Sequence, residues 1–147
     1  MCAPREIPLI RSSSQLFVGT HDFRAFSGQL EQKAKQKGGA VPTVRTIYDV
    51  RLIDEGAGLY KIDFHLQGAL YKMVRNMVGT ALNVAKGDVE LAELKRLLDE
   101  APPRKENKSK VRQRLIVSCI LISSSHPSLA TFTYILFTAR SCPRPMP

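Results

Sequence analysis

The residues from Leu70 to Ala85 carry the most regular hydrophobic pattern in the chain, and this pattern limits the fold more than any other feature. Apolar residues recur there at the three- and four-residue spacing of a single helix face. They are Leu70, Met73, Val74, Met77, Val78, Ala81, Leu82 and Ala85. An apolar helix face has to be covered by other elements. The pattern therefore predicts a helix that packs on a sheet and stops at Gly87.

Two segments with strand periodicity precede this helix. Val44 to Ile53 and Leu59 to Gln67 each alternate with a period of two, and residues 54–58 between them read Asp-Glu-Gly-Ala-Gly, which is typical of a turn. An antiparallel hairpin is the simplest account.

A second helix is predicted after Gly87, opened by Asp88 and ended by Pro102 and Pro103. Its apolar positions are Leu91, Leu94, Leu97 and Leu98. Two strands followed by two helices predict an α+β fold, an antiparallel sheet with helices packed on one face.

Upstream of the hairpin the patterns are weaker. Leu16 to Phe26 is interpreted as a loop and a short helical turn that Thr20 or Asp22 could cap. Residues 31–39 are mostly Lys and Gln and end in two glycines, so we expect a surface loop without a core face.

The 147 residues suit one globular domain, with the organised part at residues 15–110. Residues 1–14 are an atypical N-terminal segment without the apolar stretch of a secretory signal. Residues 111–147 contain four arginines and no Asp or Glu, and we expect this atypical tail to be disordered. A membrane span over Leu115 to Ala139 is disfavoured by the serines and Pro127 at its middle.

The chain has a formal net charge of +9, which favours a phosphate-bearing partner. Its three cysteines and three histidines lack the spacing of a disulfide framework or a zinc site, so we expect an intracellular protein without a metal.

Three residues of the strongest helix are not explained by its apolar pattern. Tyr71, Arg75 and Gly79 follow at four-residue spacing and form a stripe along the border of the apolar face. Arg75 could reach solvent or a local carboxylate such as Asp63. It could equally be held at a cleft to pair with a catalytic carboxylate or an RNA phosphate.

Several stretches in order resemble the C-terminal part of the TruA family of tRNA pseudouridine synthases, over about residues 15–109. They are Gly-Thr-His-Asp-Phe-Arg-Ala-Phe at 19–26, Val-Arg-Thr-Ile at 44–47, Leu-Tyr-Lys-Met-Val-Arg-Asn-Met-Val-Gly at 70–79 and Val-Ala-Lys-Gly at 84–87. The resemblance implies one of the two α+β halves that surround the family's cleft. It also implies isomerisation of uridine to pseudouridine in the anticodon arm of tRNA, without cofactor or metal.

The resemblance assigns roles to individual residues. Arg75 matches the arginine that pairs with the family's catalytic aspartate, Leu70 and Tyr71 match residues that border the base pocket, and Arg45 matches a position that is RNA-facing or structural. The aspartate itself belongs to a Gly-Arg-Thr-Asp-type loop of the N-terminal half, which this sequence does not contain. His21, Asp22 and Phe23 match motif positions that are likewise RNA-facing or structural, and for His21 and Asp22 we favour a capped turn. The implied partner is tRNA, and a homodimer as in the family stays open.

Two hypotheses compete, and a third is weaker. The first is a fragment of a tRNA pseudouridine synthase that lacks the nucleophile and is inactive alone. The alternative is a basic RNA-binding module without catalysis, and the weakest is a protein tethered to a membrane by its tail. The cations that support the second hypothesis are Lys33, Lys35, Lys37, Arg104, Lys105, Lys108 and Lys110.

Overall fold

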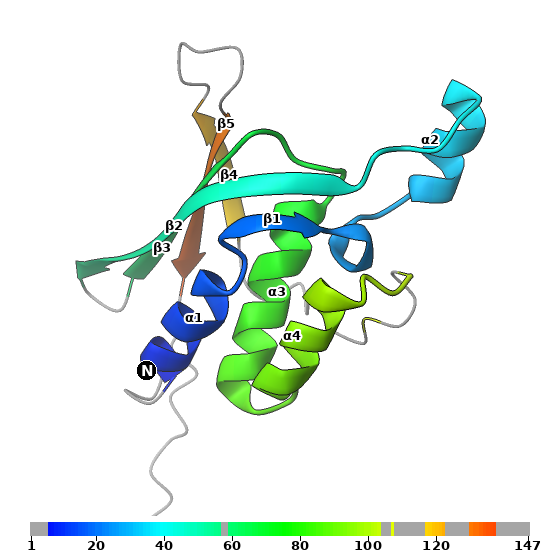
Figure 1. The fold of residues 1–147 in the computed structure, drawn as a ribbon. Helices are drawn as coiled ribbons and strands as arrows, with labels where there is room; N and C mark the ends of the chain where they lie inside the picture. The colour runs from blue at the N-terminus through cyan, green and yellow to red at the C-terminus, as the bar shows by residue number, and fades with distance from the viewer. Residues whose placement is uncertain (1–5, 57–58, 104–106, 108–116, 123–129, 138–147) are drawn as a thin grey trace, which may run out of the picture.

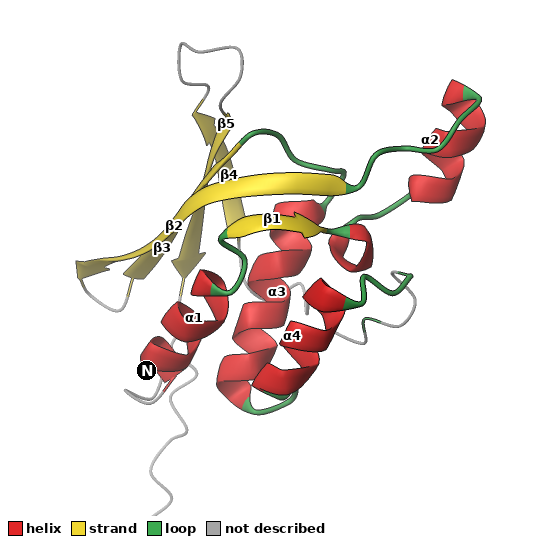
Figure 2. Cartoon of the chain, in the orientation of Figure 1, coloured by secondary structure: helices red, strands yellow, loops and turns green. Residues whose placement is uncertain are grey.

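The computed structural model describes residues 6–56, 59–103, 107, 117–122 and 130–137, and these form one antiparallel sheet with helices against it (Figure 1). The helices are α1 (Glu6–Gln15), the 3-10 turn η1 (Arg24–Phe26), α2 (Leu30–Lys37), α3 (Met73–Lys86) and α4 (Leu91–Asp99). The strands are β1 (Gly19–Asp22), β2 (Val44–Gly56), β3 (Leu59–Leu66), β4 (Val117–Ile122) and β5 (Ala130–Phe137). Within the described residues the sheet order is β1-β2-β3-β5-β4 (Figure 2).

The predicted hairpin is confirmed as β2 and β3, but its alternation is interrupted by a bulge. Ile47 pairs with Leu66 while Asp49 pairs with His65, so Tyr48 is the extra residue of β2. The bulge lets both Ile47 and Val50 be buried, which a strict period of two does not allow.

The predicted amphipathic helix is confirmed as α3, which lies under the sheet (Figure 1). Its apolar face is buried together with Ile62 and Phe64 of β3 and with Leu94 and Leu97 of α4. The α+β class, with the helices on one face of an antiparallel sheet, is therefore confirmed.

Residues 6–15, for which the sequence pattern predicted no element, form α1. This helix packs beside α3 (Figure 1). Its buried positions are Ile10, Ser13 and Ser14, which share one helix face at i, i+3 and i+4. A search for apolar periodicity overlooks a face made largely of serine. The Ser13 hydroxyl is satisfied because it donates to the carbonyl oxygen of Leu9 at 2.7 Å.

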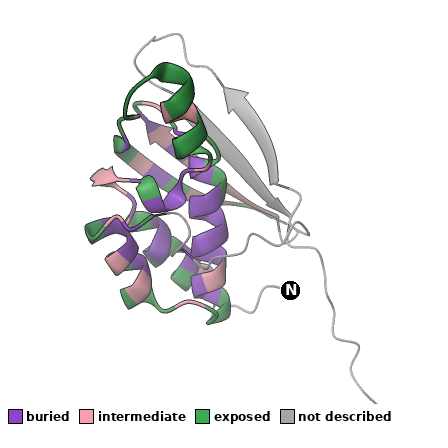
Figure 3. Cartoon of the chain, turned by 90° about the vertical axis from the view of Figure 1, so that its right-hand side faces the viewer, coloured by how far each residue is buried: buried purple, intermediate pink, exposed green. Residues whose placement is uncertain are grey.

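Residues 30–37 form a helix, α2, and not the predicted loop. Leu, Glu, Gln, Lys and Ala are all strong helix formers, and Gly38 ends the helix in the left-handed region with φ of 67°. The predicted absence of a core face is confirmed, since no residue of α2 is fully buried (Figure 3).

The expectation of a disordered tail does not hold for residues 117–122 and 130–137, which form β4 and β5. β5 pairs with the whole of β3, from Leu59 opposite Phe137 to Leu66 opposite Ala130. Pro127 disrupts a continuous apolar span, but in the sequence it falls between these two strands. Residues 111–116, 123–129 and 138–147 lie outside the described part of the chain, and within that part no helix is long and apolar enough to cross a membrane.

Candidate active site

The candidate site lies at the start of α3, at residues 70–75. Leu70 is buried in the core, whereas Tyr71 and Arg75 are exposed. The local alternative for Arg75 is not observed, because Asp63 pairs with Lys61, with 3.5 Å between the ammonium nitrogen and the carboxylate. No ion pair of the described residues includes Arg75.

Arg96 on α4 shows what a structurally paired arginine looks like in this molecule. Its guanidinium lies 2.8 Å from a carboxylate oxygen of Glu93 and 3.0 Å from one of Glu100. Hydrogen bonds to Glu93, and then to Glu100, raise the pKa of Arg96 above its ordinary value. Arg75 has no such partner among the described residues, so its guanidinium is available to an external anion.

Tyr71 lies in a cationic setting at the surface. The ammonium nitrogen of Lys33 lies over the Tyr71 ring at 5.0 Å from its centroid, and that of Lys72 lies over it at 5.2 Å. The Gly28 N–H donates to the Tyr71 carbonyl oxygen at 2.9 Å. A Cβ atom at position 28 would lie 3.4 Å from Cδ1 of the ring, so this segment packs directly against Tyr71.

Backbone strain is concentrated around the same contact. Gln29, directly after Gly28, has φ of 56°, and Lys72, directly after Tyr71, has φ of 57°. Residues other than glycine rarely adopt this left-handed conformation, and each instance costs on the order of 1 kcal/mol or more. The fold therefore holds the Gly28 and Tyr71 segments in place against a local cost.

Two buried asparagines, which sequence reasoning missed, hold the η1 turn, one from α3 and the other from the segment after α4. Nδ2 of Asn76 donates to the carbonyl oxygen of Phe26 at 2.5 Å, and Nδ2 of Asn107 donates to that of Ala25 at 3.1 Å. Asn76 directly follows Arg75 and is 8% exposed. In the sequence, the only sign of its role is a polar residue within an otherwise apolar helix. Asn107 could not be placed from the sequence, because its partner lies 82 residues away.

Residues 19–22 form strand β1, paired with β2, and not the expected loop, whereas the expected short helical turn follows as η1 at residues 24–26. The N–H of Arg24 donates to Oδ1 of Asp22 at 3.0 Å, so Asp22 caps the turn. His21 contacts the Val18 carbonyl oxygen through Nε2 at 3.2 Å, and its ring packs on Phe23 at 5.9 Å between centroids. These contacts fit a structural role for both residues.

Arg45 lies on β2 directly opposite His21 of β1. Its Nη1 donates to the carbonyl oxygen of Val44 at 2.8 Å. No interaction of the described residues joins Arg45 to Leu70, Tyr71 or Arg75, so the structure does not bring it into their cluster. Its role toward RNA stays a prediction.

The geometry defines a class of protein: an α+β layer that presents, at the start of α3, a lysine-flanked tyrosine and an arginine with no ion-pair partner among the described residues. In such a layer the guanidinium cannot act as a base or a nucleophile. It can only bind and orient an anionic group.

Comparison with known proteins identifies the family. A family described as tRNA pseudouridine synthase matches residues 14–119, and the chain belongs to this family. A tRNA pseudouridine synthase A of Streptococcus thermophilus (strain CNRZ 1066) is 37% identical over 98 residues, which are 65% of this chain and 36% of the relative. One from Bacillus cereus, named tRNA pseudouridine synthase A 1, is 41% identical over 88 residues, 59% of this chain and 32% of the relative. The chain thus spans about a third of the length of these curated relatives.

Proposed function

We propose that this chain supplies the arginine-bearing half of a tRNA pseudouridine synthase site, which isomerises uridine to pseudouridine in the anticodon arm of tRNA. The observation that carries the proposal is the exposed Arg75 without a carboxylate partner among the described residues, in a chain of this family. Product and substrate are isomers, so the reaction needs no co-reactant, and we propose no cofactor.

The role proposed for Arg75 follows from its chemistry. A guanidinium presents two parallel N–H donors that match the two oxygens of a carboxylate. An aspartate held in this way stays ionised and keeps a fixed orientation. The aspartate is supplied by the N-terminal half, so we expect the present chain to be inactive alone.

Leu70 and Tyr71 are proposed to border the base, one from the core side and the other from the surface. Leu70 is 8% exposed and Tyr71 39% exposed, so this short segment spans the boundary between core and solvent. Arg45 is proposed to contact RNA away from the base. We further propose an intracellular location and leave a homodimer as a prediction.

The test is reconstitution with the full chain. We would fuse it behind the part of the Streptococcus thermophilus relative that precedes the matched region, and measure pseudouridine in tRNA with the fusion and with the chain alone. The proposal predicts product from the fusion and none from the chain alone. Product from the chain alone, or a folded fusion that binds tRNA without forming product, would contradict it.

A basic RNA-binding role without catalysis remains the second candidate, favoured by α2. Lys35 and Lys37 are exposed on this helix, which extends away from the sheet (Figure 1). The other basic cluster, Arg104, Lys105, Lys108 and Lys110, lies outside the described residues. Salt-sensitive tRNA binding by an inactive fusion would favour this candidate.

A further inference from the structure

We propose that Lys33, Tyr71 and Lys72 form a single binding subsite for one phosphodiester of the RNA backbone, separate from the carboxylate-binding role of Arg75. The inference rests on the proposed function in that RNA is the ligand, but it concerns residues from two distant segments. Lys33 belongs to α2, whereas Tyr71 and Lys72 directly precede α3.

The convergence of two like charges is the first argument. Both ammonium groups lie over one ring, at 5.0 and 5.2 Å from its centroid. A cation over an exposed aromatic ring gains only about 0.5–1 kcal/mol, and two cations near one ring repel each other. No ion pair of the described residues includes Lys33 or Lys72. An anion between or beside them would remove this repulsion.

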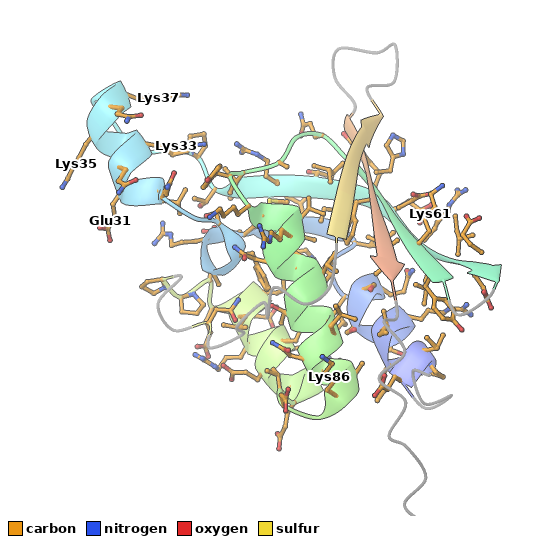
Figure 4. All side chains as sticks on the ribbon, turned by 180° about the vertical axis from the view of Figure 1, so that it is seen from behind. Glu31, Lys33, Lys35, Lys37, Lys61 and Lys86 are labelled. Carbon is orange, nitrogen blue, oxygen red and sulfur yellow. The ribbon has the colours of Figure 1, made fainter. Side chains whose placement is uncertain are left out.

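The position of Lys33 on its helix is the second argument. Figure 4 shows Lys33 on the side of α2 near the body of the molecule and Lys35 pointing away from it. Lys33 is half-buried, whereas Lys35 and Lys37 are exposed. α2 buries no residue fully, so the contact of Lys33 with Tyr71 is a specific link between this helix and the start of α3.

The backbone supports the same geometry. Gly28 and Tyr71 are joined by a backbone hydrogen bond, and the residue after each of them is in the left-handed region: Gln29 with φ of 56° and Lys72 with φ of 57°. Strained residues persist where the surrounding structure fixes them, often at ligand sites. The strain here fixes the two chain segments from which the ring and the lysines project.

The chemistry of the two lysines points to a phosphodiester. Ammonium groups are compact point charges that bind phosphate oxygens without the fixed two-point geometry that carboxylates share with arginine. The Tyr71 ring keeps both ammonium groups close to one another, and each retains N–H donors for phosphate oxygens. Such a contact positions RNA without reading its sequence.

The test is tRNA binding by the full chain as a function of salt, with Lys33→Ala, Lys72→Ala and the double variant. For single strands, one phosphate contact contributes about 0.7 to the slope of log affinity against log salt. Removing that contact should therefore lower the affinity about fivefold at 0.1 M salt. Because both lysines serve one phosphate, each single variant should lose most of this and the double variant little more. Additive losses with a slope change of about 1.4 would mean separate contacts and would overturn the shared subsite.

Two controls separate the site from general charge effects. Lys86→Ala removes the same charge from an exposed position at the other end of α3 and should change affinity by less than about twofold, so an equal loss in this variant would overturn the proposal. Tyr71→Phe keeps the ring and should keep the affinity. Tyr71→Ala should reproduce the loss seen for the lysine variants, and its fold is checked by circular dichroism.

A competition experiment distinguishes RNA from free phosphate. At constant ionic strength, 1 mM inorganic phosphate should leave the lysine-dependent part of tRNA binding in place. If phosphate abolishes that part, the subsite takes free phosphate and the proposal is wrong. The outcome is independent of catalysis, because an inactive fusion with the lysine effect intact would reject the proposed function while retaining this subsite.

Discussion

Nδ2 of Asn76 donates a hydrogen bond to the carbonyl oxygen of Phe26 at 2.5 Å, and this contact ties the η1 turn to the residue that follows Arg75. The contact spans 50 residues of sequence and is buried. The carbonyl oxygen of Asn76 in turn accepts a hydrogen bond from the Thr80 hydroxyl at 2.8 Å. The first turns of α3 and the Phe26 turn are therefore fixed relative to each other.

Replacing Asn76 should destabilise the protein. Asn76→Ala leaves the Phe26 carbonyl oxygen buried without its donor, which costs about 1–3 kcal/mol. The free energy of unfolding, measured with urea, should fall by this amount. Asn83→Ala is the matched control on the same helix, because Asn83 is only half-buried and its side chain makes no hydrogen bond within the described residues. Equal effects of the two substitutions would contradict the role of the Asn76 contact.

Helix α1 should contribute to the core. Ile10 is 2% exposed, and Ile10→Ala should lower the free energy of unfolding by about 2–5 kcal/mol. Leu9 is 41% exposed, so Leu9→Ala should change it by less than about 0.5 kcal/mol. If both variants unfold at the urea concentration of the unchanged protein, α1 does not pack as described.

Strand β5 should protect its backbone from solvent exchange. It lies between β3 and β4, so its N–H groups bond to one neighbour or the other. Hydrogen exchange followed by mass spectrometry should show the amides of residues 130–137 exchanging as slowly as those of β3. Exchange at the rate of an unfolded peptide would restore the expectation of a disordered tail.

The elements that could be predicted from the sequence are those whose pattern is local. α3 and the hairpin bury enough apolar side chains at fixed spacing for periodicity to identify them. α1 was missed because Ser13 and Ser14 occupy its buried face, and β5 because its pairing depends on the open edge of β3. The bulge at Tyr48 depends on which side chains the helices cover, which is likewise not local.

In the candidate site, too, residues in a local motif could be predicted from the sequence, whereas contacts between distant segments could not. The resemblance identified Arg75 and Tyr71 from their neighbours in sequence. The contacts of Tyr71 with Lys33, and of Asn76 with Phe26, join segments separated by the whole hairpin. Such contacts arise from tertiary packing, so no spacing rule could have predicted them.

The last prediction concerns catalysis and uses the reconstituted fusion. Arg75→Ala should reduce pseudouridine formation about 100-fold or more, because the partner aspartate loses both its orientation and part of its ionisation. Arg75→Lys should be intermediate at best, since an ammonium group cannot make the two-point contact. Binding of tRNA should remain mostly intact in both variants, because the cations of α2 are unchanged.

The control for this prediction is Arg11→Ala, which removes an exposed arginine from α1 and should leave the rate unchanged. The measurement is the initial rate of pseudouridine formation at saturating tRNA, with affinity determined separately. Weaker tRNA binding with an unchanged rate at saturating tRNA would assign Arg75 to the RNA phosphates. Full activity of Arg75→Ala would show that another residue orients the catalytic aspartate, since a guanidinium that contacts the nucleophile cannot be removed without affecting the chemical step.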